Sequence, residues 1–168
     1  LKGKVIVVTG AAGLLGKKHA EAIAAYGGIP VLLDLSGEAV ENLASKLNLE
    51  YNIDATGYAV DITDELQIKN NCEVIINKFG KIDGLVNNAA NNPKVEDDGE
   101  KSFSRLENFP LDIWNQDVAV GLTGAFLCAK YYGMKISQNT QGGSIVNISS
   151  DLGLIAPDQH LYMKEGLN

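Results

Sequence analysis

LKGKVIVVTGAAGLLG, residues 1–16, is the stretch that decides the fold of this chain. Its run Val5–Val8 is short, unbroken and β-branched, which is typical of a strand buried on both faces of a parallel sheet. A glycine-rich turn over residues 9–16 follows at once, and the Ala-rich residues 17–26 predict a helix. Such turns can serve chain reversal alone, but strand, glycine turn and helix in this order favour the opening βαβ unit of a dinucleotide-binding domain.

Each glycine of the T-G-x-x-G-x-x-G pattern has its own expected task. We expect Gly10 to let the chain turn sharply after the strand, and Gly13 to let the backbone approach a pyrophosphate without an intervening Cβ. Gly16 would let the helix pack closely on the sheet, with the N–H groups of the first helical turn directed at the phosphates. The stretch therefore predicts a phosphate-binding turn.

The composition indicates one folded domain over residues 1–168. Apolar residues make up 45% of the chain and charged residues 21%, so a substantial core can form. The net charge is −7 and Arg105 is the single arginine, which argues against a nucleic-acid partner. No apolar run is long enough for a transmembrane helix and no signal peptide pattern precedes the first strand, so we expect no membrane partner. Cys72 and Cys128 lack metal-ligand spacing, which predicts no metal site and two buried thiols in a reducing cytoplasm.

Strands and helices alternate along the chain. Further strands are predicted at residues 29–34, 58–60, 85–86 and 144–148, and helices at 36–47, 64–79 and 111–137, with a solvated loop from Asn91 to Asn108. This rhythm predicts an α/β fold: a Rossmann-like, doubly wound parallel sheet in a three-layer α/β/α arrangement. The unusual polar residues follow strand ends, where such sheets bind ligands: Thr9 to Gly16, Asp34, Asp61, Asn87 to Ala90 and Ser149–Ser150.

Two aspartates at strand ends have expected roles in the same site. Asp34 ends the second strand, where a carboxylate can accept hydrogen bonds from ribose hydroxyls and repels a 2′-phosphate, so NAD is favoured over NADP. Asp34 could instead cap the next helix, but Ser36 is better placed for that role. Asp61 can accept a hydrogen bond from the adenine amino group, with Ile62 packed on the ring. It can also belong to the N-cap region of the next helix, and the two roles are compatible.

Five motifs in order resemble the short-chain dehydrogenase/reductase family over essentially the whole chain. They are TGAAGLLG (9–16), Asp34, the DIT turn (61–63), NNAA (87–90) and GGSIVNISS (142–150). The resemblance implies an NAD(P)-dependent oxidoreductase with these cofactor-binding residues: Gly10, Gly13, Leu15, Gly16, Asp34, Leu35, Asp61, Ile62, Asn88, Ala89 and Ala90. It also implies that Asn87 ties the central strands together and that Ser150 is a catalytic residue that orients the substrate carbonyl. The long helix over residues 111–137 would then pair subunits in a homodimer or homotetramer.

Several positions depart from the family pattern. The glycine spacing TGxxGxxG replaces the usual TGxxxGxG and is closer to the extended branch of the family. Ala90 stands where a glycine is usual, and Gly121 stands where an asparagine usually supports a proton relay. Without the family context, a Ser150 hydroxyl that bonds the local backbone would be the default interpretation.

The catalytic Tyr-x-x-x-Lys pattern is absent from residues 1–168. Tyr162 is followed four residues later by Gly166, and Lys164 would lie on a different helix face. A tyrosine without a nearby ammonium is a poor acid–base at neutral pH, so Tyr162 is interpreted as a substrate-loop residue. Residues 151–168 resemble a subgroup with an enlarged loop before the catalytic pair. We therefore expect a domain truncated before its C-terminal βα units, with the catalytic Tyr and Lys beyond Asn168.

Three functions follow as alternatives. The first is an NAD-dependent dehydrogenase or reductase that moves a hydride between nicotinamide and a carbonyl or alcohol carbon, with a carbohydrate derivative as one candidate substrate. NADP is less favoured as the cofactor, although Lys17 and Lys18 could offset this by binding a phosphate. The second is a catalytically silent dinucleotide-binding or redox-sensing module, which the missing Tyr–Lys pair and Gly121 would support. The third and weakest is another Rossmann-type enzyme such as a methyltransferase, where NNAA and NISS have no reason to recur.

Overall fold

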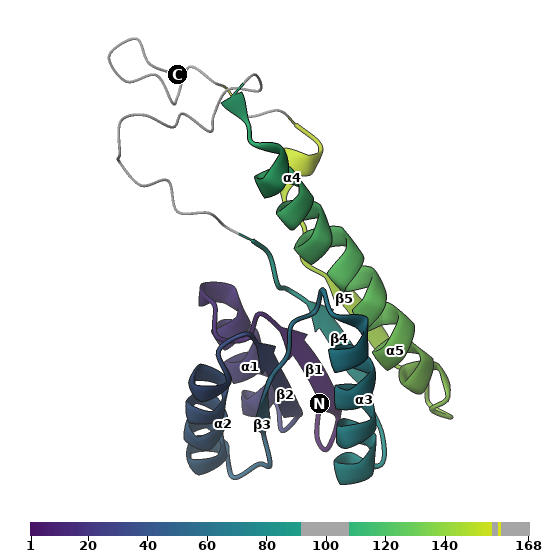
Figure 1. Cartoon of the computed structure of the whole chain (residues 1–168). Helices are drawn as coiled ribbons and strands as arrows, with labels where there is room; N and C mark the ends of the chain where they lie inside the picture. The colour runs from purple at the N-terminus through teal and green to yellow at the C-terminus, as the bar shows by residue number, and fades with distance from the viewer. Residues whose placement is uncertain (92–107, 156–157, 159–168) are drawn as a thin grey trace.

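The computed structural model describes residues 1–91, 108–155 and 158 (Figure 1). Its strands are β1 (Val5–Thr9), β2 (Ile29–Asp34), β3 (Thr56–Ala59), β4 (Gly84–Asn87) and β5 (Ser144–Asn147). Its helices are α1 (Leu14–Ala25), α2 (Gly37–Tyr51), α3 (Glu65–Phe79), α4 (Leu111–Val118) and α5 (Ala125–Ser137), with a π-helical segment η2 (Ala119–Gly124) and a 3-10 turn η3 (Asp151–Gly153). Among the described residues, no helix has both the length and the apolar character needed to cross a membrane.

The strands form one parallel sheet in the order β3-β2-β1-β4-β5. The β-branched run of β1 lies at its centre, where the fully buried Val7 pairs in register with Val31 of β2 and Leu85 of β4. From β1 the chain extends the sheet to one side through β2 and β3 and then returns to extend it to the other side through β4 and β5. The predicted doubly wound sheet is therefore confirmed, and its strand order reverses between β1 and β4.

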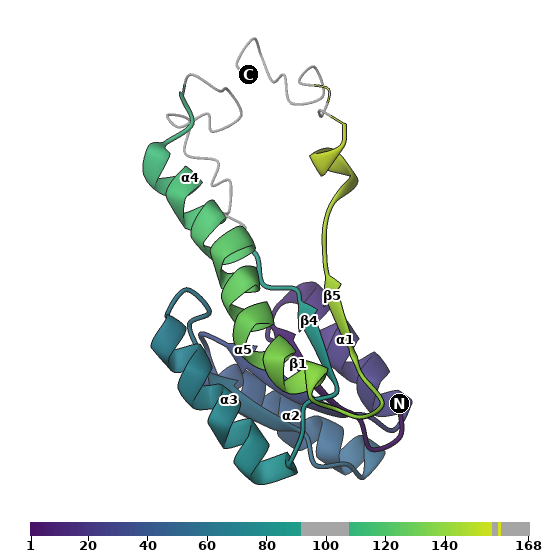
Figure 2. The same cartoon turned by 90° about the vertical axis from the view of Figure 1, so that its right-hand side faces the viewer.

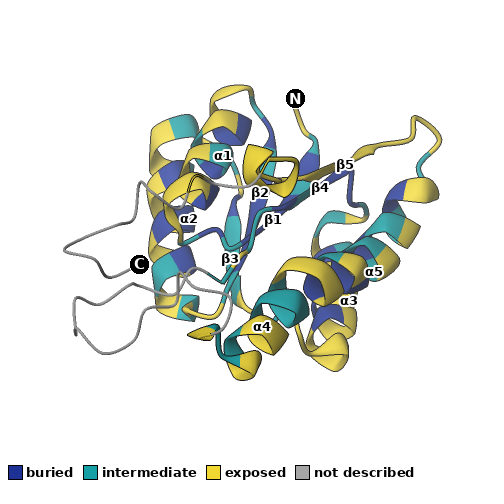
Figure 3. Ribbon diagram, turned by 90° about the horizontal axis from the view of Figure 1, so that it is seen from above, coloured by how far each residue is buried: buried dark blue, intermediate teal, exposed yellow. Residues whose placement is uncertain are grey.

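Helices cover both faces of the sheet and give the predicted three layers (Figure 3). On one face, α1 and α2 enclose a core that includes Val8, Leu32 and Leu47. On the other face, α3 and α5 enclose a second core that includes Ile75 and the fully buried Tyr132. Each helix thus buries one apolar side against the sheet, which leaves the ends of the strands as the open edges of the molecule.

Two free cysteines lie in the second core, Cys72 on α3 and Cys128 on α5. Burial raises the pKa of the Cys72 thiol to about 11 and that of Cys128 to about 12. At neutral pH both side chains are therefore protonated, apolar packing groups. The expected pair of buried thiols is confirmed.

The α2–β3 connection differs from its predicted boundaries. α2 continues a turn beyond its predicted end to Tyr51, and Asn52 ends it in a left-handed conformation with φ of 52°. The Asn48 side chain then makes two hydrogen bonds to the backbone of Ala55, accepting at 2.6 Å and donating at 2.9 Å. These bonds straighten the chain early, so β3 begins at Thr56, before the predicted strand.

The predicted long helix over residues 111–137 forms one continuous rod in which η2 separates α4 from α5 (Figure 2). α5 packs on the sheet, while α4 extends past its carboxyl edge (Figure 2). A π-helical segment inside an α-helix often marks a functional site. The predicted loop 91–108 lies outside the described residues except at its two ends, and so does the segment that contains Tyr162, Lys164 and Gly166.

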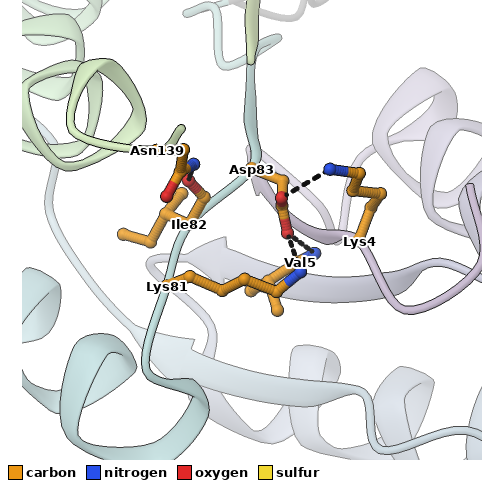
Figure 4. A network of polar contacts seen from close by, with 6 residues as sticks. All are labelled: Lys4, Val5, Lys81, Ile82, Asp83 and Asn139. Atoms are coloured by element: carbon orange, nitrogen blue, oxygen red, sulfur yellow. Dashed lines mark hydrogen bonds and ion pairs between the residues drawn. The ribbon is translucent and has the colours of Figure 1, made fainter. Parts of the chain in front are cut away.

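A carboxylate is buried at the amino edge of the sheet, just before β4 (Figure 4). Asp83 accepts hydrogen bonds at 2.9 Å from the Val5 amide and from the ammonium groups of Lys4 and Lys81. Burial alone would raise the pKa of Asp83, but the hydrogen bonds from Lys81, Val5 and Lys4 hold it below its usual value. Sequence analysis did not single out this cluster, which joins β1 to β4 at the end remote from the glycine turn.

Candidate functional site

A cleft of about 490 Å³ opens at the carboxyl edge of the sheet, where the strand order reverses. Residues at the carboxyl ends of β1, β2 and β4 line it on one side, and Gln116 of α4 and Val120 of η2 line it on the other. All the predicted cofactor-binding residues except Gly16 line it: Gly10, Gly13, Leu15, Asp34, Leu35, Asp61, Ile62, Asn88, Ala89 and Ala90. The structure thus brings together residues from four separate chain segments in a cavity of ordinary ligand size.

Two glycines of the turn are required by the fold itself. Gly10 has a φ of +62°, and a Cβ on it would lie 2.8 Å from the Cα of Ala89. A Cβ on Gly16 would collide with the carbonyl oxygen of Gly10 and with the backbone of Ala11. Gly16 therefore lies beneath the turn, where it allows α1 to approach the sheet closely as predicted, and does not face the cleft.

Gly13 differs from these two glycines because its backbone would accept a side chain. It is the N-cap of α1 with an extended φ of −73°, and the nearest atom to an added Cβ is the Gly10 carbonyl oxygen at 3.2 Å. No side chain caps the helix, so the N–H groups of its first turn, which have no partner within the helix, are left beside the cleft. α1 begins at Leu14, earlier than the predicted Lys17, which makes the end of the glycine turn the first turn of the helix.

The Asp34 carboxylate lies between the glycine turn and the start of α2. Its Oδ2 accepts a hydrogen bond from the Ala12 amide at 3.0 Å, and its Oδ1 accepts a longer one from the Ser36 amide at 3.3 Å. The side chain of Ser36 caps α2 by accepting from the Ala39 amide at 3.4 Å, so Asp34 is not needed as the N-cap. Each carboxylate oxygen has two lone pairs, so Asp34 keeps acceptor capacity toward the cleft. The Ala12 contact was not predicted.

Asp61 forms a local turn at the far end of the cleft. Its Oδ1 accepts from the amide and the hydroxyl of Thr63 at 2.8 and 2.7 Å. The N-cap of α3 is Asp64, whose pKa is lowered mainly by hydrogen bonds from the backbone and side chain of Gln67. Ile62 is buried and contributes to both the core and the cleft. Asp61 is therefore not the N-cap of α3, but its side chain forms a turn with Thr63 just before that helix.

The NNAA segment is bonded to both neighbouring strands. The Thr9 hydroxyl accepts from the amides of Asn88 and Ala89 at 3.0 and 3.1 Å, and Asn88 Nδ2 donates to the carbonyl oxygen of Thr9 at 2.9 Å. Asn87 Nδ2 donates to Asn147 Oδ1 at 2.8 Å, which joins β4 to β5. Asn87 thus ties β4 to its neighbour β5, the last strand of the described sheet, and Asn88 ties β4 to the central strand β1.

Ser150 is not among the residues that line the cleft. Its exposed Oγ accepts from the Leu152 amide at 3.2 Å and caps η3, on a segment that leaves the sheet beyond β5 (Figure 2). A bond of the Ser150 hydroxyl to the local backbone is what the sequence predicts when the family resemblance is set aside. The catalytic role of Ser150 stays a prediction. Gly121 lies in η2 with no atom within 4 Å of an added Cβ, so an asparagine would fit there sterically.

Sequence analysis missed several residues of the cleft: Leu14, Leu33, Val60, Asn91, Gln116 and Val120. Leu33 lies near the end of β2 and Val60 directly follows β3, each beside a residue that was predicted, so their place follows from the ends of these strands. Gln116 and Val120 come from the long helix, and only the tertiary position of that helix brings them to the cleft.

Comparison with known proteins finds a matching protein family and similar oxidoreductases. A family model described as "short chain dehydrogenase" matches residues 4–162. An uncharacterized oxidoreductase of Bacillus subtilis is 36% identical over 155 residues, which is 92% of this chain and 56% of that protein. The D-threitol dehydrogenase of Mycolicibacterium smegmatis is 33% identical over 161 residues, which is 96% of this chain and 58% of that protein.

A solved structure shows the same architecture. The NAD⁺-bound xylitol dehydrogenase superposes with a TM-score of 0.82 at 30% identity, over 93% of this chain and 56% of that chain. The chain thus spans little more than half the length of the relatives it matches. The match of the family model to nearly all of its residues, together with the cleft at the strand-order reversal, shows that the chain belongs to the short chain dehydrogenase family.

Proposed function

We propose that this chain is the cofactor-binding part of an NAD-dependent oxidoreductase that transfers a hydride between nicotinamide and an alcohol or carbonyl carbon. The observation that carries the proposal is the cleft at the strand-order reversal, where a glycine turn, an uncapped helix N-terminus and a carboxylate at the end of β2 converge. The family uses NAD(H) or NADP(H). Residues 1–168 would form a single NAD(P)-binding domain or its N-terminal portion.

The residues present fit a dinucleotide. Gly13 leaves space where a Cβ would stand, so the first-turn amides of α1, with Leu15 beside them, would bind the diphosphate. Asp34 and Leu35 would hold the adenosine ribose, and Asp61 with Ile62 would hold the adenine. Asn88, Ala89 and Ala90 would lie against the cofactor from the opposite strand. The bound nicotinamide would supply the hydride acceptor or donor, and these residues of the chain would bind and orient it.

The charge around the cleft favours NAD over NADP. A 2′-phosphate placed beside the Asp34 carboxylate would be repelled, and the described residues that line the cleft include no lysine or arginine. Lys18, one of the two lysines that could bind a phosphate, forms an ion pair with Glu21 at 2.8 Å. The side-chain hydrogen bond to Glu21 also raises the pKa of Lys18, consistent with a pair on the exposed side of α1.

A polyol or related carbohydrate derivative is the substrate class we propose. The D-threitol and xylitol dehydrogenases, to which this chain is similar, are named for polyols. Ser150 would orient the reacting oxygen, and the catalytic tyrosine and lysine would lie beyond Asn168. The relatives named above are oxidoreductases, which favours an enzyme over a catalytically silent module.

The long helix carries exposed apolar side chains that would pair subunits. Trp114, Leu122 and Phe126 are 58%, 67% and 61% exposed, and Met134 continues this exposed apolar set. An exposed apolar patch on a helix is a common interface between copies of one chain. We propose a homodimer or homotetramer through this helix, in the cytoplasm, where buried thiols stay reduced.

Calorimetric titration of the full-length protein with NADH, NADPH and ADP-ribose tests the proposal. We expect NADH and ADP-ribose to bind, and NADPH to bind at least about tenfold more weakly because of Asp34. Oxidation of xylitol and threitol with NAD⁺ is then followed by the absorbance of NADH. Absence of NADH binding would contradict the proposal, while binding without turnover on a broad panel of alcohols would favour the silent module.

A further inference from the structure

The two glycines of the π-helical segment η2 have different surroundings. Gly121 is exposed, and no atom lies within 4 Å of an added Cβ. Gly124 is buried, and a Cβ on it would lie 2.7 Å from Cδ1, 2.8 Å from Cγ1 and 3.2 Å from the carbonyl oxygen of Ile62. Packed carbon atoms do not approach one another so closely. The absence of a side chain at Gly124 therefore lets η2 pack directly on Ile62.

Ile62 belongs both to the protein core and to the cofactor cleft. Its side chain is 8% exposed and packs in the core that α3 and α5 enclose, and it also lines the cleft beside Asp61. One side of Ile62 thus faces closely packed side chains and the other faces open space. When a larger neighbour displaces Ile62, the side chain moves toward the cleft, because the packed core has no space to receive it.

The backbone on both sides of this contact is held by hydrogen bonds. In the turn that carries Ile62, the Asp61 amide donates to Oε1 of Gln67 at 3.0 Å. Directly after η2, the carbonyl oxygen of Ala125 accepts from Nδ2 of Asn87 at 3.3 Å, and α5 then continues into the core. Neither backbone is free to move away, so the isoleucine side chain must move when the contact is overfilled.

We propose that Gly124 is a positioning residue that keeps the Ile62 side chain out of the adenine end of the cofactor cleft. The inference rests on the proposed function, in which Asp61 and Ile62 hold the adenine. Gly124 is not among the residues that line the cleft, so it acts through Ile62. A larger residue at position 124 turns Ile62 into the space that the adenine ring needs.

Titration of the full-length protein with NADH and with ADP-ribose tests this role. Gly124→Ala should raise both dissociation constants about tenfold, because both ligands carry the adenine. The loss should become smaller as residue 62 is shortened, since Ile62→Val removes Cδ1 and Ile62→Ala removes Cγ1 as well. Relative to each variant at position 62 alone, we expect Gly124→Ala to cost about threefold with Ile62→Val and less than about twofold with Ile62→Ala. A merely structural role of Gly124 would not make the loss of affinity depend on residue 62.

Gly28 supplies a matched control remote from the cleft. It directly precedes β2, and a Cβ on it would lie 2.7 Å from Cγ2 and 3.0 Å from the carbonyl oxygen of Ile23, a core residue on the other face of the sheet. Gly28→Ala thus produces a similar collision with an isoleucine, but neither residue lines the cleft. NADH affinity, measured at a temperature where every variant is folded, should stay within about twofold of wild type.

The outcomes separate this inference from the proposed function. An unchanged affinity in Gly124→Ala, a loss that is equal whichever residue stands at position 62, or an equal loss in Gly28→Ala overturns the positioning role alone. If Gly124→Ala by itself does not fold, the combinations with Ile62→Val and Ile62→Ala, in which the collision is reduced, give the same comparison. A wild-type protein that binds neither NADH nor ADP-ribose overturns the proposed function and this inference with it.

Discussion

The two edges of the sheet each place an aspartate beside a strand end, and the two carboxylates are used in opposite ways. At the amino edge, Asp83 is buried and receives two ammonium groups and a backbone amide, all at 2.9 Å (Figure 4). At the carboxyl edge, Asp34 is only partly buried and receives two backbone amides, one of them at the long distance of 3.3 Å. The first carboxylate is paired with cations, and the second is left without one.

This difference separates stabilisation from ligand binding within one sheet. A buried carboxylate with matched cations holds β1 to β4 and has little left to offer a ligand. A carboxylate that lacks a cation and faces a cleft keeps its charge available to discriminate between ligands. The glycines divide in the same way, because a Cβ on Gly10 or Gly16 would collide with backbone atoms, while a Cβ on Gly13 would make one tight contact at 3.2 Å.

A side chain at Gly13 should have the largest effect on NADH affinity. An unchanged affinity would contradict the assignment of the carboxyl edge to ligand binding. Gly13→Val places a side chain at the mouth of the cleft, where its Cβ would lie 3.2 Å from the Gly10 carbonyl oxygen, a tight contact that a shift of a few tenths of an ångström would relieve. We expect the Kd for NADH to rise by about a hundredfold or more, because the diphosphate loses its approach to the first-turn amides. Calorimetry measures the affinity, and thermal unfolding should show a nearly unchanged midpoint.

Gly16→Ala is the matched control for this variant. Its Cβ would collide with the Gly10 carbonyl oxygen, so we expect the free energy of unfolding to fall. The main effect of Gly16→Ala should therefore be on stability and not on NADH affinity. NADH binding that survives Gly13→Val would show that the turn serves only chain reversal.

Removal of the charge at Asp34 should have the next largest effect. Asp34→Asn weakens NADH binding by about 30-fold, because a hydrogen bond to a charged acceptor is worth roughly 1.5–3 kcal/mol. It also removes the repulsion of a 2′-phosphate, so the ratio of the NADPH and NADH dissociation constants should fall. If Asp34 served only to accept the hydrogen bond from Ala12, its replacement would lower the affinities for NADH and NADPH equally. An unchanged ratio of the two dissociation constants in paired titrations would therefore contradict the assignment of Asp34 to the ribose.

The corresponding change at the amino edge should alter stability and leave binding intact. Asp83→Asn keeps an acceptor for the Val5 amide but loses both ion pairs, and we expect the free energy of unfolding to fall by about 1–2 kcal/mol. The estimate is modest because the lysine side chains are 35% and 42% exposed and can be hydrated instead. NADH affinity, measured at a temperature where both proteins are folded, should be the same.

The pH dependence of this difference gives a second measurement. The pKa of Asp83 is lowered in the folded state, so the unfolded chain binds a proton more readily and stability falls as the pH falls. The contribution of Asp83 is fully present above about pH 4, the ordinary pKa of an aspartate, and is lost as the pH drops through the folded-state value. Denaturant unfolding should therefore show wild type and Asp83→Asn converging in acid, and a constant difference would mean that the charge of Asp83 is not what stabilises the edge.

The fold was predictable because its signals are local. The β-branched run of β1, the glycine turn and the apolar face of α3 are each contained in a few consecutive residues, and their order implies a parallel sheet. The cleft was predictable for the same reason, since the carboxyl ends of parallel strands must meet at one edge. Family resemblance then added Leu35 and gave Leu15 and Asn88, already among the strand-end residues, a role in binding the cofactor.

Contacts between distant segments were not predictable. Asp83 meets Lys4 across 79 positions of the chain, and Asn91 meets Asp117 across 26, with no periodic pattern to connect either pair. The early start of β3 depends on the Asn48 side chain, whose partner Ala55 lies across a turn. The π-helical segment η2 was not predicted either, since residues 111–137 were interpreted as one regular helix.

The smallest effect is expected at Gly121, in the π-helical segment η2 beside the cleft. Gly121 is exposed and has open space around an added Cβ, so Gly121→Ala should stabilise the protein by about 0.5–1 kcal/mol through helix propensity alone. A residue at the carboxyl edge that could be replaced by a more stabilising one would fit the comparison of the two edges, because at the amino edge Asp83 and its ion pairs stabilise the fold. If the glycine instead permits movement of α4, the more rigid variant should be more stable but should bind NADH with an altered rate. Stopped-flow fluorescence measures that rate, and a variant that gains stability with unchanged binding kinetics would show that η2 does not limit cofactor entry.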